Sequence, residues 1–194
     1  MQFSYSNNKV SLLTIEDYEY YYIKCDNQKS NKFLFHLHGG VSNPAFDCEQ
    51  DISLSFLIEN NTDFISSFKV DFNIILPIKK DSLNWIDNYE YVFSQLELVK
   101  SRLINDTTSK SEVYISGFSD GGTGAFKIFY DFEYFFDGLL VFNGFPQHNN
   151  FSASIDYNSV KQKTIIHVST QMDKQIPYEF QLVEFRKQRL SNKE

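Results

Sequence analysis

The sequence predicts an α/β fold with three layers, in which helices flank a mostly parallel central sheet. From Phe33 onward, strand-like segments alternate with helix-like segments along the chain, a pattern typical of parallel sheets covered by helices. The strand segments are almost entirely apolar, as expected for strands that are buried on both faces. Because the 194 residues contain no repeat and no linker-like tract, we expect one domain spanning residues 1–194.

The expected strands begin near the N-terminus. Residues 2–5 and 9–15 are short and mixed, whereas Tyr18–Cys25 is rich in aromatic and β-branched side chains, which favour strands. The later strand segments are Phe33–Leu37, Phe72–Pro77, Glu112–Ser116, Gly138–Phe142 and Thr164–Val168. Helices are expected at residues 50–68, Tyr89–Leu103, Thr123–Phe136 and Pro177–Leu190.

Composition and charge limit the partners. A hydrophobic fraction of 42% indicates a globular chain rather than a disordered one. The formal net charge of -7 at pH 7 argues against a phosphate-backbone partner, so no nucleic acid is expected. No apolar run is long enough to cross a bilayer, and the first residues lack the pattern of a signal peptide. We therefore expect no membrane partner and a cytoplasmic location.

The cysteines and histidines indicate neither a disulfide framework nor a metal site. Cys25 and Cys48 form no C-x-x-C pair. Of the four histidines, His36 and His38 alone are closely spaced, which is a weak pattern for metal ligands. We expect no metal and no cofactor.

Residues 117–121 match the pattern G-x-S-x-G, with Ser119 at the centre. An apolar strand segment precedes them and a helical segment follows, which is the context of a nucleophile elbow. Such a turn is so tight that its serine takes a strained backbone conformation, and the flanking glycines remove side chains that would collide. The hydroxyl is then exposed, and the next amide, of Asp120, lies at a helix N-terminus where it can donate to an oxyanion.

A glycine-rich turn that cradles a phosphate is the alternative interpretation of this stretch. It lacks the G-x-G-x-x-G and G-x-x-x-x-G-K-[ST] spacings of phosphate-binding loops. Glycine is also scarce and concentrated, because six of the eight glycines lie at positions 39, 40, 117, 121, 122 and 124. The nucleophile elbow is therefore favoured.

A second glycine pair, in His38-Gly39-Gly40, follows the strand segment Phe33–Leu37. Ligands of open α/β sheets bind at this carboxyl edge of the strands. Together with the elbow, the pair resembles the α/β-hydrolase fold, most closely the compact esterases and dienelactone-hydrolase-like members. The resemblance extends from Tyr18 to Leu190. It implies a mechanism without a cofactor, in which a serine attacks an acyl substrate.

The resemblance also implies roles for individual residues. The amides of Asp120 and of Gly40 or Val41 would form the oxyanion hole, and His38 would be structural. Asp173, four residues before Pro177, is similar to the family's aspartate and would orient and stabilise a histidine. Thr170 stands where the family commonly has glycine, and an aspartate that caps a turn or helix is the alternative interpretation of Asp173.

The family's catalytic histidine follows the acid in chain order, after one more strand, but no histidine follows Asp173. Three explanations stay open: the chain is truncated at its C-terminus, the fold binds without catalysing, or another histidine serves. His148, in the loop after Gly138–Phe142, is the candidate for the replacement base. His36 and His167 lie within strands and are expected to be structural.

We therefore expect an esterase-like serine hydrolase that acts on a small ester or acyl substrate through an acyl-enzyme on Ser119. A catalytically inactive binding or interaction protein of the same fold is the alternative, and a flavodoxin-like nucleotide binder leaves the elbow unexplained. Without a base, Ser119 is too weakly acidic to attack at useful rates, so we expect little activity and no imidazole between Ser119 and Asp173. A missing final strand would expose an apolar sheet edge, through which a homodimer could form.

Overall fold

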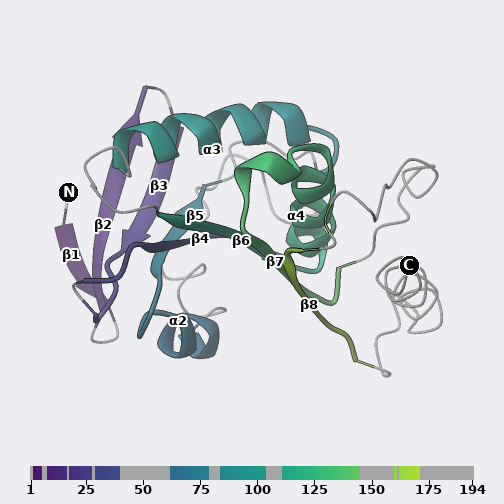
Figure 1. Cartoon of the computed structure of the whole chain (residues 1–194). Helices are drawn as coiled ribbons and strands as arrows, with labels where there is room; N and C mark the ends of the chain where they lie inside the picture. Colours follow the sequence, from purple (N-terminus) through teal and green to yellow (C-terminus); the bar gives the residue numbers. More distant parts are fainter. Residues whose placement is uncertain are drawn as a thin grey trace, which may run out of the picture.

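The computed structural model describes residues 2–5, 8–16, 18–27, 29–39, 62–78, 84–103, 111–144, 160 and 162–170. Within these ranges one eight-stranded sheet has the order β1-β2-β3-β5-β4-β6-β7-β8 (Figure 1). Its strands are β1 (Gln2–Tyr5), β2 (Asn8–Ile15), β3 (Tyr18–Ile23), β4 (Lys32–Leu37), β5 (Asn73–Pro77), β6 (Glu112–Phe118), β7 (Gly138–Phe142) and β8 (Thr164–Val168). The helices are α2 (Thr62–Phe68), α3 (Tyr89–Leu103), α4 (Asp120–Asp131) and the 3-10 turn η1 (Glu133–Phe135).

The sheet has a parallel part and an antiparallel part. Strands β5, β4, β6, β7 and β8 pair in parallel, which confirms the predicted parallel sheet. Strands β1, β2 and β3 form an antiparallel extension that joins the edge of β5. β6, which precedes Ser119, lies between β4 and β7. The segment that carries the elbow motif is therefore held by a neighbour on each side.

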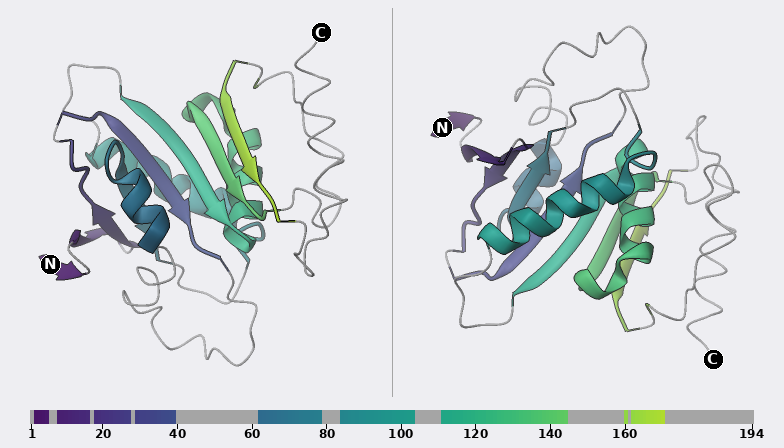
Figure 2. Two further views of the ribbon diagram at one scale, coloured as in Figure 1. Left: turned by 90° about the horizontal axis from the view of Figure 1, so that it is seen from below. Right: turned by 90° about the horizontal axis from the view of Figure 1, so that it is seen from above.

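Helices cover both faces, as the three-layer prediction requires. α3 and α4 lie on one face and α2 on the other (Figures 1 and 2). The main core lies between the sheet and α3 with α4, and α2 closes a smaller core through Ile65. The main core is rich in phenylalanine; its members include Phe33, Phe35, Phe93, Phe126, Phe129, Phe135 and Phe136.

The elbow helix differs from the predicted range Thr123–Phe136 at both ends. It begins earlier, at Asp120, because the backbone adopts helical geometry directly after Ser119, although two glycines lie in the first turn of the helix. It ends earlier, at Asp131, because Phe132 leaves helical geometry with φ -128° and ψ 42°. The Phe132 ring instead stacks on Phe93 of α3 at a centroid distance of 3.6 Å. The region 133–135 then forms the separate turn η1.

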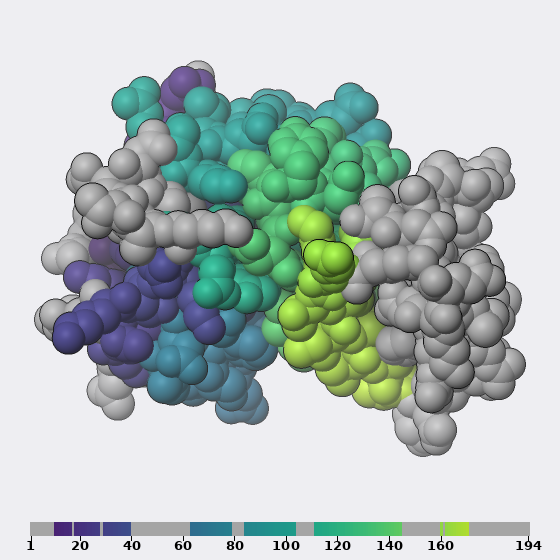
Figure 3. Space-filling view, viewed as in Figure 1, coloured from purple at the N-terminus to yellow at the C-terminus, as the bar shows by residue number. Residues whose placement is uncertain are grey.

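The apolar sequence of the last described strand, β8, predicts burial on both faces, but one face of the strand is exposed. Thr164, Ile166 and Val168 are exposed, and the alternate residues are half-buried. β8 pairs with β7 on one side and is the outermost strand of the described sheet. Figure 3 shows residues of β8 at the surface of the molecule.

Two predicted helices fall largely or wholly outside the described residues. α2 is the described part of the helix predicted at residues 50–68, and Pro177–Leu190 lies entirely outside. None of the helices in the described ranges is both long enough and apolar enough to cross a membrane.

Candidate active site

Ser119 lies at the tip of the turn between β6 and α4, with φ 54° and ψ -118°. A positive φ is rare for a residue with a side chain and persists only where neighbouring structure imposes it. Here the Ser119 amide donates to the Phe142 carbonyl of β7 at 2.9 Å, and the Thr123 amide donates to the Ser119 carbonyl at 3.0 Å. The serine is thus fixed to the neighbouring strand and to its own helix.

Close backbone approaches explain the two glycines that flank the serine. A Cβ atom on Gly117 would lie 2.1 Å from the Gly121 carbonyl oxygen. A Cβ atom on Gly121 would lie 2.1 Å from the carbonyl oxygen of Leu37, at the end of β4. Neither position accommodates a side chain, which is the geometry that the G-x-S-x-G spacing predicts.

Asp120 is the first residue of α4. Its amide lies at a helix N-terminus, where the partial positive charge of the backbone favours an anion. Its carboxylate accepts a longer hydrogen bond, 3.4 Å, from the Trp85 amide. The side chain therefore contacts the segment before α3.

The loop after β4 adjoins the elbow. β4 pairs with β6 up to the register Leu37 with Gly117. A Cβ atom on Gly39 would lie 2.6 Å from Cδ1 of Phe118, so the loop backbone rests against the residue before the serine. Gly39 and the elbow thus meet at one edge of the sheet. Gly40 and Val41 lie outside the described residues, so their amides as oxyanion donors stay a prediction.

Each of the three described histidines is held within the fold. The ring of His38 is 2% exposed, and its Nδ1 donates to the Gly39 carbonyl at 3.1 Å. His36 Nδ1 lies 2.8 Å from Ser116 Oγ in the centre of the sheet. His167 Nε2 donates to the Gly144 carbonyl at 3.2 Å, close to the elbow helix. These contacts agree with the structural roles expected for the three rings.

The remaining predicted catalytic residues, His148 and Asp173, lie outside the described residues. Within the described ranges no cluster of three or more histidine, cysteine, aspartate or glutamate residues could hold a metal ion. The pKa shifts resolved there belong to four tyrosines and one lysine: burial raises the pKa of Tyr20, Tyr22, Tyr89 and Tyr114, the last two to about 12, and lowers that of Lys100.

Two residues near the elbow escaped the sequence analysis. Trp85 donates from its indole nitrogen to the His38 carbonyl at 2.9 Å. Asn143, with φ 48°, follows β7 and accepts from the Thr170 amide at 2.9 Å. Both contacts link segments that are distant in sequence. The available signals were weak: Trp85 is the single tryptophan of the chain, and Asn143 precedes a glycine.

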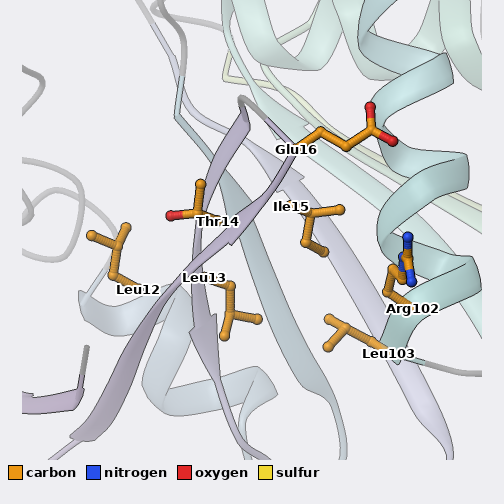
Figure 4. Close-up of a pocket in the computed structure, with 7 residues that line it drawn as sticks. All are labelled: Leu12, Leu13, Thr14, Ile15, Glu16, Arg102 and Leu103. Atoms are coloured by element: carbon orange, nitrogen blue, oxygen red, sulfur yellow. The ribbon is translucent and has the colours of Figure 1, made fainter.

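A pocket of about 390 Å³ lies elsewhere, between β2 and the end of α3 (Figure 4). Apolar side chains, one hydroxyl and two charged groups line it: Leu12, Leu13, Thr14, Ile15, Glu16, Arg102 and Leu103. In the sheet order β2 is four strand steps from β6, each step measuring about 4.8 Å. This pocket is therefore separate from the surroundings of Ser119.

Known proteins resemble this chain in fold rather than in sequence. Neither a protein-family model nor a curated protein matches the sequence. A thermostable esterase superimposes with a TM-score of 0.66 at 13% identity, over 95% of this chain and 52% of the esterase. An alpha-beta serine hydrolase homologue from Coxiella burnetii gives 0.62 at 14% identity, over 92% and 81% of the two chains. The chain has an α/β-hydrolase-like fold.

A third structure agrees, from a Klebsiella pneumoniae protein assigned as a dienelactone hydrolase. It gives a TM-score of 0.62 at 12% identity, over 94% of this chain and 81% of that one. The chain spans about half the length of the thermostable esterase. In an α/β-hydrolase fold the nucleophile projects from the strand-to-helix turn at the top of the sheet. Ser119, between β6 and α4, occupies such a turn in this α/β-hydrolase-like fold.

Proposed function

We propose that the chain is a serine hydrolase of the esterase type, which acts on a small ester or related acyl compound. The observation that carries the proposal is the backbone of Ser119, whose φ of 54° and ψ of -118° place a strained serine between β6 and α4. Such strain persists at functional sites because surrounding structure imposes it. The α/β-hydrolase-like fold and its structural neighbours, among them an esterase, support the same function.

In the proposed reaction the Ser119 oxygen attacks the substrate carbonyl and transfers its proton to a base. The amide of Asp120 and that of Gly40 or Val41 donate to the oxyanion that forms. Collapse of this intermediate expels the alcohol, which takes the proton from the base, and leaves an acyl group on Ser119. Water, activated by the same base, then hydrolyses the acyl-enzyme. Asp173 orients the base and stabilises its protonated form.

The proposed base is His148, which replaces the expectation that no imidazole lies between Ser119 and Asp173. The other three histidines have structural partners: His38 binds the Gly39 carbonyl, His36 lies against Ser116, and His167 binds the Gly144 carbonyl. His148 follows β7 along the chain, and the Phe142 carbonyl at the end of that strand accepts from the Ser119 amide. General-base catalysis usually contributes roughly 10²–10⁴-fold, so loss of this residue should reduce the reaction to near background.

A fluorophosphonate probe tests the nucleophile. The purified chain should form a covalent adduct, located at Ser119 by peptide mass, and Ser119→Ala should abolish it. Hydrolysis of p-nitrophenyl acetate by the wild type, Ser119→Ala and His148→Ala should then show a loss in both variants. An adduct at another residue, or ester hydrolysis that survives Ser119→Ala, would refute the proposed function.

A non-catalytic binding protein of the same fold is the second candidate. The engagement of all three described histidines in structural contacts favours it, because it restricts the supply of a base. This function predicts a folded wild-type chain that neither reacts with the probe nor hydrolyses the ester. A wild type that reacts at Ser119 excludes it.

A further inference from the structure

Trp85 precedes α3 in the chain and is 1% exposed. Its indole Nε1–H donates to the His38 carbonyl oxygen at 2.9 Å, and its ring meets the His38 ring edge to face at 5.1 Å. The Trp85 side chain therefore binds the loop that follows β4.

The same residue also binds the elbow helix. The Trp85 amide donates to the Asp120 carboxylate at 3.4 Å. A Cβ atom on Gly124 would lie 2.4 Å from the Trp85 Cβ, so this part of α4 lies directly against the tryptophan. Trp85 thus contacts, from a third segment, both segments that adjoin Ser119.

The elbow helix carries the Asp120 amide assigned to the oxyanion hole, and the loop after β4 is the segment that the sequence predicts to supply the second amide. A planar trans peptide directs its carbonyl and its amide to opposite sides. Fixing the His38 carbonyl against the indole therefore fixes the orientation of the 38–39 peptide. On the other side, the contacts to Asp120 and Gly124 fix the first turn of α4 relative to the same indole.

We propose that Trp85 is a positioning residue, which holds the 38–39 peptide after β4 and the start of α4 at a fixed separation beside Ser119. The inference rests on the proposed hydrolase function and extends it to a residue that does not touch the reacting atoms. Oxyanion donors act when they lie about 2.7–3.1 Å from the developing charge, so a shift of one loop by a fraction of an ångström removes much of their effect. Loss of one donor usually lowers kcat by roughly 10²–10³-fold.

The test compares Trp85→Phe with Phe93→Leu in the full chain. The phenylalanine fills part of the space but lacks the indole N–H. Phe93→Leu also removes buried aromatic volume from the main core, but Phe93 stacks or packs on Phe132, Phe135 and Phe136, which all follow the end of α4. Both variants are first shown to be folded by circular dichroism and denaturant unfolding.

We expect Trp85→Phe to slow the phosphonylation of Ser119 at least tenfold, and Phe93→Leu to change it less than twofold at similar stability. With p-nitrophenyl acetate, Trp85→Phe should lower kcat and leave KM within about twofold, because substrate binding before charge develops needs no oxyanion donor. Equal rates in Trp85→Phe and the wild type would overturn the inference. An equal loss in both variants would also overturn it, because destabilisation alone would then account for the effect.

Hydrogen exchange separates this inference from the proposed function. Trp85→Phe should accelerate amide exchange in residues 37–39 and 119–123, whereas Phe93→Leu should not accelerate it selectively there. If wild-type Ser119 fails to react, the proposed function is refuted, and exchange alone decides whether Trp85 positions the two segments. Unchanged exchange in both segments of Trp85→Phe would refute the positioning role whatever the activity.

Discussion

The turn at Ser119 and the edge strand β8 differ in how completely their neighbours fix them. At the turn, Gly121, Gly122, Thr123 and Gly124 are all buried. A Cβ atom added at Gly121 would collide with the backbone at the end of β4. Along β8 every second residue is exposed, with Ile166 at 47% and Val168 at 46%. The turn is held by strands on both sides, whereas β8 pairs with β7 alone among the described strands.

The difference shows where this fold tolerates change. A strained conformation such as that of Ser119 requires dense, non-local support, and that support leaves no space for additional atoms. Among the described residues, no strand pairs with the outer side of β8 and every second side chain is exposed, so its sequence is constrained mainly by the residues that point into the core. A substitution should therefore destabilise the protein more, the closer its position lies to the turn.

The largest effect is expected for Gly121→Ala. Its new Cβ atom would lie 2.1 Å from the Leu37 carbonyl oxygen and 2.5 Å from that of His38, and backbone cannot move aside as a flexible side chain can. Overpacking in a close-packed interior usually costs about 1–3 kcal/mol or more, and here we expect at least about 3 kcal/mol or a chain that does not fold. Urea unfolding measures it, with Ser101→Ala on the exposed face of α3 as the control. A free energy of unfolding within about 1 kcal/mol of the wild-type value would contradict the close packing of the turn. Such a difference is less than a tenfold change in the folding equilibrium, because tenfold corresponds to about 1.4 kcal/mol.

A smaller loss is expected for Ser116→Ala, directly before the turn. Ser116 Oγ lies 2.8 Å from His36 Nδ1 and donates to the Phe35 carbonyl at 3.3 Å, and both side chains are fully buried. Removing the hydroxyl takes a buried partner from the imidazole, which usually costs about 1–3 kcal/mol. Ser94→Ala, which deletes an exposed hydroxyl that donates to the Tyr91 carbonyl, should cost well under half as much. Equal losses in the two variants would show that burial of the His36 contact contributes nothing.

Asn143 joins the two regions that are compared, and its loss should have an intermediate effect. Its φ is 48°, and its Oδ1 accepts from the Thr170 amide, which fixes the chain after β8 to the end of β7. Asn143→Ala loses the hydrogen bond and replaces asparagine, which tolerates the left-handed region, with alanine, which rarely adopts it; together these changes cost about 1–3 kcal/mol.

Two further variants separate the hydrogen bond from the backbone conformation at position 143. Asn143→Gly removes the side-chain acceptor but adopts a positive φ without strain. Asn143→Asp retains an acceptor for the Thr170 amide. We expect denaturant unfolding to rank stability as wild type, then Asn143→Asp, then Asn143→Gly, then Asn143→Ala. If Asn143→Gly matches the wild type, the hydrogen bond to Thr170 contributes nothing measurable.

The same contrast separates what the sequence could predict from what it could not. Local patterns specify the turn: the spacing of Gly117, Ser119 and Gly121 predicts a strained serine, and the apolar runs at β6 and β7 predict their strands almost to the residue. The strand order and the contacts of Trp85 depend on residues far apart in the sequence. Trp85 and the His38 carbonyl are 47 positions apart, and no periodicity within either segment encodes that contact.

The exposure of β8 escaped prediction for a related reason. The residues of Thr164–Val168 are mostly apolar, which predicts a buried strand. Burial of an apolar strand also depends on which segments of the chain cover its two faces. Of the site residues, Ser119 and the approach of Gly39 to the elbow are found where the sequence predicts them. The catalytic roles of Ser119 and Asp120 stay predictions, and so do those of Gly40, Val41, His148 and Asp173, which lie outside the described ranges.

The smallest effect is expected on the exposed face of β8, where Ile166→Thr and Ile165→Thr form a matched pair. Ile165 packs against the main core, whereas Ile166, the next residue of the strand, is 47% exposed. Threonine retains the β-branched shape that strands favour, and both variants replace an ethyl group with a hydroxyl, so they differ mainly in the environment of that replacement. We expect Ile166→Thr to change the free energy of unfolding by less than about 0.5 kcal/mol, as surface substitutions usually do, and Ile165→Thr to cost at least twice that. Unfolding at several protein concentrations completes the experiment. A large, concentration-dependent loss in Ile166→Thr would contradict the exposed face, and would show instead that a second copy of the chain covers β8 in solution, because only an intermolecular contact makes the midpoint depend on concentration.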